Sequence, residues 1–165
     1  MKKIYLVLLP FLLFSCMDDT DEVNKERVQG TWMHEFLNGD ETVQTTFTFN
    51  SNGTFESQNV RTQSEGDYEL GVLSLSTGTY ALEGGELVIR DRAYFYAEDY
   101  ENPPATAEEL VESDFAYPIE QRVKISFEDN NSAMILLFYE CHDIIPSSFS
   151  FCAEPKPIRY ERVEE

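Results

Sequence analysis

Short segments of alternating apolar and polar residues, separated by turn residues about every dozen positions, run through residues 28–92. The pattern is clearest at 42–50, where alternation with period two places four apolar or threonine side chains on one face. These residues are Val43, Thr45, Phe47 and Phe49. Asn52-Gly53 follows as a hairpin turn, since Asn-Gly tolerates the positive φ that tight hairpins require. No long helical stripe appears, so the pattern predicts an all-β sandwich or barrel.

Further strand segments lie on both sides of one long interruption. We expect strands at 31–37, 42–50, 54–61, 68–82, 86–92, 121–128, 132–140 and 158–163. Gly84-Gly85 predicts a second hairpin turn, and Thr77-Gly78 predicts a break within its strand. Short turns of this kind are typical of antiparallel neighbours.

The long interruption, residues 93–117, is acidic and aromatic and lacks regular spacing. Pro103-Pro104 blocks regular structure there, whereas 105–112 can form a short helix. Insertions of this length in a compact domain are usually functional or disordered. We therefore expect the function of the protein to reside in this insertion.

Residues 1–15 are typical of a signal peptide. Lys2-Lys3 precedes an apolar run at 4–14, and about eleven residues are too few to span a bilayer of roughly 30 Å as a helix. Leu13-Phe14-Ser15-Cys16 resembles the lipobox of bacterial lipoproteins, although Phe14 is larger than the residue usual at its place. The alternative is an ordinary secretory signal that contains a cysteine. We expect lipidation of Cys16, which would anchor the protein to a membrane without spanning it.

The sequence carries a formal net charge of -19, which becomes -21 when the two lysines of residues 1–15 are removed. Such a charge repels nucleic-acid phosphates and favours cationic or neutral partners, so we expect no nucleic-acid binding. Acidic residues follow Cys16 closely, at Asp18, Asp19, Asp21 and Glu22. This run resembles the surface-export signal of lipoproteins in the Bacteroidetes group, and the alternative is a solvated tether. We expect a cell-envelope protein, anchored in the outer membrane or exposed at the cell surface, with a tether at 16–27 and one domain at 28–165.

Lipidation of Cys16 leaves Cys141 and Cys152 as an even pair in an oxidising compartment. We expect them to form a disulfide, which would stabilise the fold by on the order of 3 kcal/mol. A zinc site would need a second Cys/His pair, which the sequence lacks. Glu140-Cys141-His142-Asp143 gathers catalytic residue types, but neighbours on a strand point to opposite faces and do not converge. We therefore expect no metal, no cofactor and no enzyme activity.

Several motifs together resemble those of the lipocalin-like lipoproteins of the Bacteroidetes group. They are the lipobox, Gly30-Thr31-Trp32, the hairpin at 47–55, Gly78-Thr79-Tyr80 with 84–87, and the closing segment 159–163. The resemblance covers 28–92 and 121–163, and it implies an eight-stranded antiparallel up-and-down barrel with room for one small ligand. It also implies that Trp32 packs at the closed end of the barrel under Arg159 or Arg162 of the last strand.

Aromatic residues gather beside acidic ones in the insertion and are the candidate contacts to a ligand or partner. They are Tyr94, Phe95, Tyr96, Tyr100, Phe115 and Tyr117. Barrel mouths often bind ligands between aromatic walls, and exposed tyrosines are frequent anchors at protein interfaces. The rings could instead plug the open end as extra core, since large aromatic residues are mostly buried. We predict a binding protein for a small apolar or sugar-like molecule. The alternative is a filled barrel that presents the insertion to a protein partner, as a subunit or an inhibitor.

Overall fold

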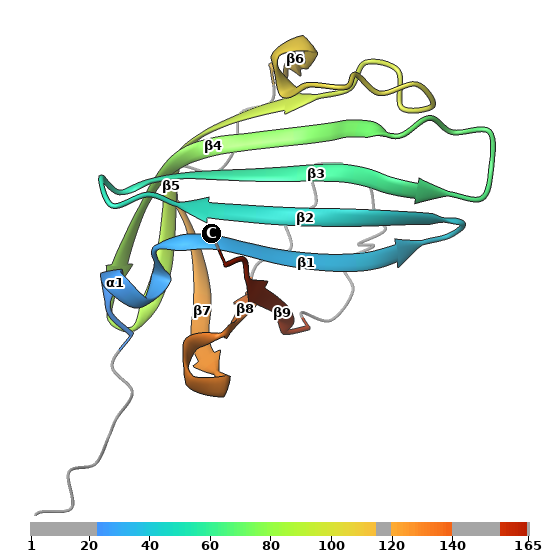
Figure 1. The fold of residues 1–165 in the computed structure, drawn as a ribbon. Helices are drawn as coiled ribbons and strands as arrows, with labels where there is room; N and C mark the ends of the chain where they lie inside the picture. The colour runs from blue at the N-terminus through green and yellow to red at the C-terminus, as the bar shows by residue number, and fades with distance from the viewer. Residues whose placement is uncertain (1–22, 115–119, 140–155, 165) are drawn as a thin grey trace, which may run out of the picture.

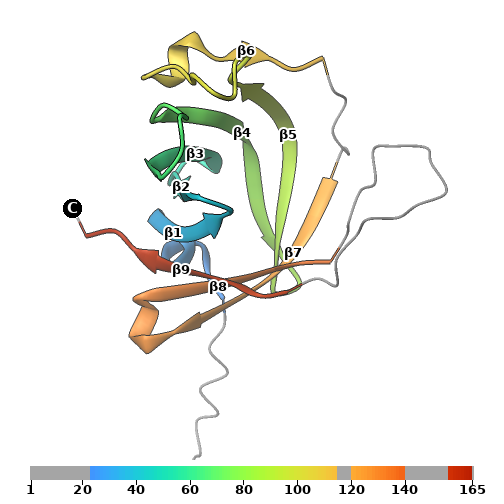
Figure 2. The same cartoon turned by 90° about the vertical axis from the view of Figure 1, so that its right-hand side faces the viewer.

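The computed structural model of the chain describes residues 23–114, 120–139 and 156–164. Eight of its strands form one closed antiparallel barrel (Figure 1, Figure 2). They are β1 (Gly30–Asn38), β2 (Glu41–Phe49), β3 (Thr54–Ser64), β4 (Gly71–Glu83), β5 (Glu86–Tyr96), β7 (Glu120–Glu128), β8 (Ala133–Phe138) and β9 (Ile158–Arg162). Each strand pairs with the next one of the barrel, and β9 returns to pair with β1. The predicted up-and-down barrel of about eight strands is confirmed.

Glycines at the turns and at one bulge shape the hairpins. Gly84 and Gly85 have φ of 63° and 82°, the left-handed backbone that a two-residue hairpin turn requires. The predicted break at Thr77-Gly78 is a β-bulge, where the register between β4 and β5 shifts. A Cβ atom on Gly78 would lie 2.6 Å from the Arg90 carbonyl oxygen and 2.8 Å from the Phe55 ring. Only glycine therefore lets β4 and β5 approach the core at this point.

Apolar side chains fill the half of the barrel where β1 begins and β9 ends, which we call the closed end. The buried core consists of Val28, Trp32, Phe47, Phe49, Phe55, Tyr80, Leu87, Ile89, Val123, Ile125, Met134, Leu136 and Tyr160. Its rings contact one another directly, as between Phe49 and Tyr80, whose centroids lie 5.0 Å apart in an edge-on arrangement. Burial of each large apolar side chain stabilises the fold by about 1.5–3 kcal/mol. The closed end therefore provides most of the apolar burial in the fold.

A short helix, α1 (Lys25–Val28), lies at the closed end (Figure 1). The Asn24 side chain caps it by accepting a hydrogen bond from the Arg27 amide. Val28 is fully buried, and its carbonyl accepts a 2.8 Å hydrogen bond from the Trp32 indole. The last residues of the predicted tether at 16–27 are thus part of the folded barrel.

Arg162 fastens α1 and Trp32 to the last strand. Its guanidinium carbon lies 4.1 Å from the centre of the Trp32 ring. The same group donates hydrogen bonds at 2.7, 2.9 and 3.1 Å to the carbonyl oxygens of Arg27, Gln29 and Asn131. Of the two arginines that the resemblance offered, Arg162 is the one that contacts Trp32. Arg159 instead forms exposed ion pairs with the carboxylates of Glu128 and Asp129.

Gly30 leaves the space that Arg162 occupies. It has a φ of 115°, and a Cβ atom there would lie 2.8 Å from Nη1 of Arg162. The glycine that precedes Thr31-Trp32 is therefore required both by its backbone conformation and by the arginine packed against it.

The insertion is shorter and less helical than the sequence predicted. β5 continues to Tyr96 through pairing with β4, so the irregular segment begins at Ala97 and not at residue 93. The helix expected at 105–112 is a single 3-10 turn, η1 (Ala107–Glu109). It ends there because the next residues form β6 (Val111–Glu112), which pairs with the end of β5. Below, the insertion means residues 97–114.

Several predicted features lie outside the described residues. They are the signal peptide 1–15, the lipidated Cys16, the acidic run at 18–22, the Cys141–Cys152 disulfide, and the aromatic residues Phe115 and Tyr117. Lipidation and the disulfide stay predictions. In the part of the chain that the structure describes, no helix has the length and apolar character needed to cross a membrane.

Replacing Arg162 with methionine keeps an apolar stem but removes the guanidinium. We expect Arg162→Met to lower the free energy of unfolding by about 3 kcal/mol, because three carbonyl groups lose a charged donor. Arg159→Met on the same strand is the matched control, and loss of its exposed ion pairs should cost about 0–1 kcal/mol. Denaturant unfolding followed by fluorescence of Trp32, the single tryptophan, measures both variants. Equal losses from the two substitutions would contradict the role given to Arg162.

Candidate functional site

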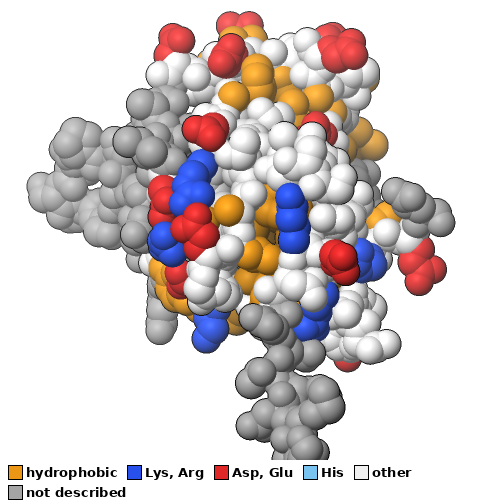
Figure 3. All heavy atoms as spheres, turned by 90° about the vertical axis from the view of Figure 1, so that its left-hand side faces the viewer, with side chains coloured by type: hydrophobic (Ala, Val, Ile, Leu, Met, Phe, Trp, Pro, Cys, Tyr) orange, Lys and Arg blue, Asp and Glu red, His pale blue; other side chains and the backbone are white. Residues whose placement is uncertain are grey.

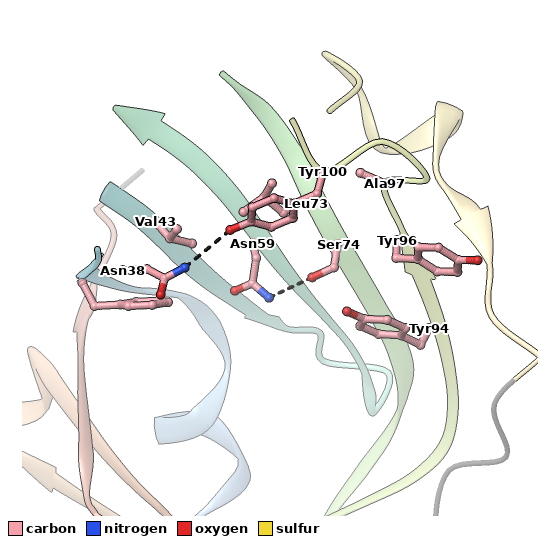
Figure 4. Close-up of a pocket in the computed structure, with 10 residues that line it drawn as sticks. Asn38, Val43, Asn59, Leu73, Ser74, Tyr94, Tyr96, Ala97 and Tyr100 are labelled. Atoms are coloured by element: carbon pink, nitrogen blue, oxygen red, sulfur yellow. Dashed lines mark hydrogen bonds between the residues drawn. The ribbon is translucent and has the colours of Figure 1, made fainter. Parts of the chain in front are cut away.

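A pocket of 340 Å³ opens at the end of the barrel opposite α1 (Figure 4). Strands β1 to β5 and the insertion line it with Phe36, Asn38, Val43, Asn59, Leu73, Ser74, Tyr94, Tyr96, Ala97 and Tyr100. Pockets for small molecules commonly measure about 300–1,000 Å³ and combine apolar walls with a few polar groups. This cavity, which we call the mouth pocket, has the size and composition of a site for a small ligand.

A row of hydrogen bonds fixes the polar wall of the mouth pocket. The Thr45 hydroxyl donates to Asn59 Oδ1 at 2.6 Å, and Asn59 Nδ2 donates to Ser74 Oγ at 2.9 Å. These residues lie side by side because the registers of β2, β3 and β4 pair Thr45 with Asn59 and Asn59 with Ser74. Ser74 accepts in this row, and nothing among the described residues receives its own hydroxyl hydrogen. The row therefore presents a positioned hydrogen-bond donor to the pocket.

Three of the predicted aromatic residues form the other wall. Tyr94 and Tyr96 line the pocket from β5, and Tyr100 lines it from the insertion. In Figure 4 the Tyr94 ring points toward Asn59 and Ser74, whereas the Tyr96 ring points away from them at the edge of the pocket. Phe95 lies between them in sequence and is not part of the lining, because alternate residues of a strand face opposite sides. Tyr96 and Tyr100 are 39% and 46% exposed. These tyrosines therefore line an open pocket and do not plug the barrel as extra core.

A buried ion pair between Arg61 and Glu41 lies behind Tyr100. Arg61 Nε is 3.0 Å from Glu41 Oε2, and the two side chains are 0% and 5% exposed. The Tyr100 hydroxyl donates to the same carboxylate oxygen at 3.0 Å, and its ring centre lies 4.6 Å from the guanidinium carbon. Burial alone would lower the pKa of Arg61, but hydrogen bonds with Glu41 and Tyr100 outweigh it and raise the pKa above its ordinary value. Arg61 is thus held charged inside the protein.

Arg61 also ties two connections to the barrel. Its guanidinium donates to the carbonyl oxygen of Glu69, between β3 and β4, at 2.7 Å and to that of Tyr100, in the insertion, at 2.9 Å. The insertion is held further by a 2.8 Å hydrogen bond from the Val72 amide to the Pro104 carbonyl. The position of Tyr100 in the pocket wall therefore depends on the buried ion pair.

The mouth of the barrel is acidic, whereas the closed end carries both signs of charge. The insertion has no lysine or arginine, and its acidic residues are Glu98, Asp99, Glu101, Glu108, Glu109, Glu112 and Asp114. Figure 3 looks onto the closed end and shows basic side chains beside acidic ones there. Along its upper edge, on the side where Figure 1 places β6, the charged side chains in view are acidic and lie beside hydrophobic ones. A field of one sign at the mouth attracts cations and repels anions.

The other candidate groups for chemistry that the structure describes are not gathered into a cluster. His34 Nδ1 lies 2.9 Å from the Arg159 carbonyl oxygen, and its ring packs between Phe36 and Tyr160 with centroid distances of 5.8 and 5.5 Å. Across 23–114, 120–139 and 156–164, no group of three or more His, Cys, Asp or Glu residues is placed to hold a metal. The segment Glu140-Cys141-His142-Asp143 lies outside these ranges.

The polar residues of the mouth pocket, Asn38, Asn59 and Ser74, were not predicted. Alternation could have identified Asn59, because it lies four residues from the buried Phe55 on β3 and so on the same, inward face of the strand. A polar residue at an inward position of a strand is a candidate for ligand contact.

Comparisons of the chain with protein-family models, curated proteins and solved structures find no match.

Neutralising Glu41 tests whether the ion pair holds the insertion. We expect Glu41→Gln to lower the free energy of unfolding by on the order of 3 kcal/mol, because Arg61 keeps a buried charge without its counterion. Amide exchange at Val72 and Ala97 should also accelerate, since hydrogen bonds of these amides hold the insertion and the strand end beside it. Asp40→Asn, an exposed neighbour, is the control and should change stability by about 0.5 kcal/mol or less. Unchanged exchange in Glu41→Gln would show that the insertion is held by other contacts.

Proposed function

We propose that this protein is a binding protein that takes a small molecule into the mouth pocket. The observation that carries the proposal is the contrast between the two ends of the barrel. The closed end is filled with buried apolar side chains, whereas the mouth contains a 340 Å³ pocket with polar groups on its wall. Polar groups in a barrel interior cost stability unless they are satisfied or serve a ligand.

The lining indicates which ligands suit the pocket. Aromatic rings supply flat apolar surface, while Asn38 and Ser74 supply hydrogen-bonding groups at defined positions. The volume is at the lower end of the usual range and suits a molecule of about one ring. Because the mouth is acidic, an uncharged or cationic ligand is favoured over an anionic one. Among the predicted ligand classes, a polar, sugar-like molecule therefore fits better than a purely apolar one.

Membrane anchoring is part of the same proposal. The lipobox places the lipid on Cys16, upstream of α1, and α1 lies at the closed end (Figure 1). A lipid anchor there would hold the closed end on the membrane side. The mouth pocket would then face away from the membrane, accessible to molecules in the surrounding solution.

The proposal includes membership among the lipocalin-like lipoproteins that the sequence resembles. Two features support it: the closed eight-stranded barrel, and Trp32 beneath Arg162 of the last strand. The protein is proposed as a carrier or receptor of a ligand and not as an enzyme, because the lining formed by the described residues offers binding groups without a nucleophile and base in contact.

A protein-binding role is the second candidate, and exposed apolar residues at the mouth favour it. Leu37, near the end of β1, is 79% exposed, and Leu70, in the connection just before β4, is 56% exposed. Exposed leucines among acidic residues are suited to a partner surface that is both apolar and basic. In this case the insertion would be a contact surface for the partner.

Removing the rings of β5 tests the small-molecule proposal. The protein is incubated with a small-molecule extract of bacterial culture, and retained ligand is measured by native mass spectrometry. We expect the wild type to retain a ligand and the Tyr94→Ala, Tyr96→Ala double variant to lose it by about tenfold or more, since two of the three rings of the aromatic wall disappear. Phe95→Ala removes a ring from the outward face of the same strand and should retain the ligand.

Equal retention by the double variant and the wild type would contradict a site at the mouth. If no small molecule is retained, but a protein partner is captured and then lost on replacing Leu37 and Leu70 with serine, the second candidate function is favoured.

A further inference from the structure

We propose that the mouth pocket selects a small organic cation, an ammonium compound that also carries a hydroxyl group, over its uncharged counterpart. The inference rests on the proposed function and specifies the charge of the ligand. It follows from aromatic walls and neutral polar groups placed inside a rim of carboxylates.

Aromatic rings give the pocket a surface that attracts cations. Phe36 lines it from β1, and Tyr94 and Tyr96 line it from β5. The face of an aromatic ring carries partial negative charge and attracts a cation within about 6 Å of its centre. Among the described residues, no lysine or arginine lies over Phe36 or Tyr96. The Tyr96 ring, and the face of Phe36 that is not stacked on His34, therefore remain available to a cationic ligand.

No positive side chain lines the mouth pocket in the described part of the chain. Arg61 lies behind Tyr100 and is neutralised by Glu41 at 3.0 Å. Arg92 donates to the Gln121 side chain at 2.7 Å and is not part of the lining. A carboxylate on the ligand would thus find no ion-pair partner in this described wall, whereas an ammonium group would meet no cation in it.

Carboxylates lie around the entrance to the pocket. An adjoining cavity of 540 Å³ shares Asn38 with the mouth pocket and is lined in part by Asp40, Asp67 and Glu101. Among the described residues these three carboxylates have no salt-bridge partner. Their charges add to the acidic insertion, and together they raise the local concentration of cations at the entrance.

The polar wall adds a second requirement. Ser74 Oγ accepts a hydrogen bond from Asn59, so the Ser74 hydroxyl hydrogen is available to an acceptor on a ligand. A hydroxyl oxygen on the ligand can receive it, while the ammonium group lies against the rings. A hydroxyl-bearing ammonium compound therefore satisfies both walls.

Choline and 3,3-dimethylbutan-1-ol test the inference, because they have nearly the same shape and hydroxyl group and differ in the charge. Isothermal titration calorimetry measures the dissociation constant of each probe with the full folded domain. We expect choline to bind about tenfold more tightly at low ionic strength. The advantage should shrink when salt rises from about 0.01 M to about 1 M, because the Debye length falls from about 30 Å to about 3 Å.

A pair of variants links the preference to the rings. Tyr96→Leu keeps apolar volume but removes the aromatic face, so choline should lose most of its advantage while the uncharged probe still binds. Phe95→Leu on the opposite face of β5 should leave the ratio unchanged, and a circular dichroism melt confirms that both variants fold. Equal affinity for the two probes, tighter binding of the uncharged one, or no binding of choline would overturn the inference. Ligand retention that depends on Tyr94 and Tyr96, but without preference for the cation, would leave the proposed function standing.

Discussion

Closure of the barrel depends on Arg162. Among the described residues, β1 and β9 share two residue pairs, Trp32 with Arg162 and Met33 with Glu161, so backbone pairing alone makes a short seam. The guanidinium adds a cation-π contact to Trp32 and hydrogen bonds to backbone carbonyls just before β1. Charge-assisted hydrogen bonds of this kind are roughly twice as strong as neutral ones. One side chain therefore joins the two ends of the barrel, and the arrangement of strands around the mouth depends on that closure.

Stability and ligand recognition are placed at opposite ends of the same strands. Along β2 the inward residues run from Phe49 and Phe47 at the closed end to Thr45 and Glu41 at the mouth. Burial of a charged pair such as Arg61 and Glu41 carries a desolvation cost that is often not recovered. The apolar core of the closed end offsets this cost, and the ion pair in return holds the insertion and one tyrosine of the pocket in position.

Strands and turns could be predicted because they follow from local rules. Alternation at 42–50 predicts a strand, and the glycines at 84 and 85 predict a hairpin turn, each from a few neighbouring residues. The end of β5 and the pairing of Arg61 with Glu41 depend instead on contacts between strands. Arg61 and Glu41 are 20 residues apart, and a register shift between β2 and β3 lies between them. Tyr94, Tyr96 and Tyr100 were predicted from composition, but the polar row that faces them requires the register of three strands.

Mapping amide chemical shifts by NMR tests most directly the claim that the mouth, and not the filled end, receives the ligand. The labelled protein is titrated in turn with choline and with simple sugars. The account predicts that the binding compound shifts the amides of Asn59, Ser74 and Ala97 around the mouth pocket. Amides of Val28 and Trp32 at the closed end should stay unchanged. Shifts concentrated at Val28 and Trp32, or no shift at the mouth with any compound that binds, would contradict it.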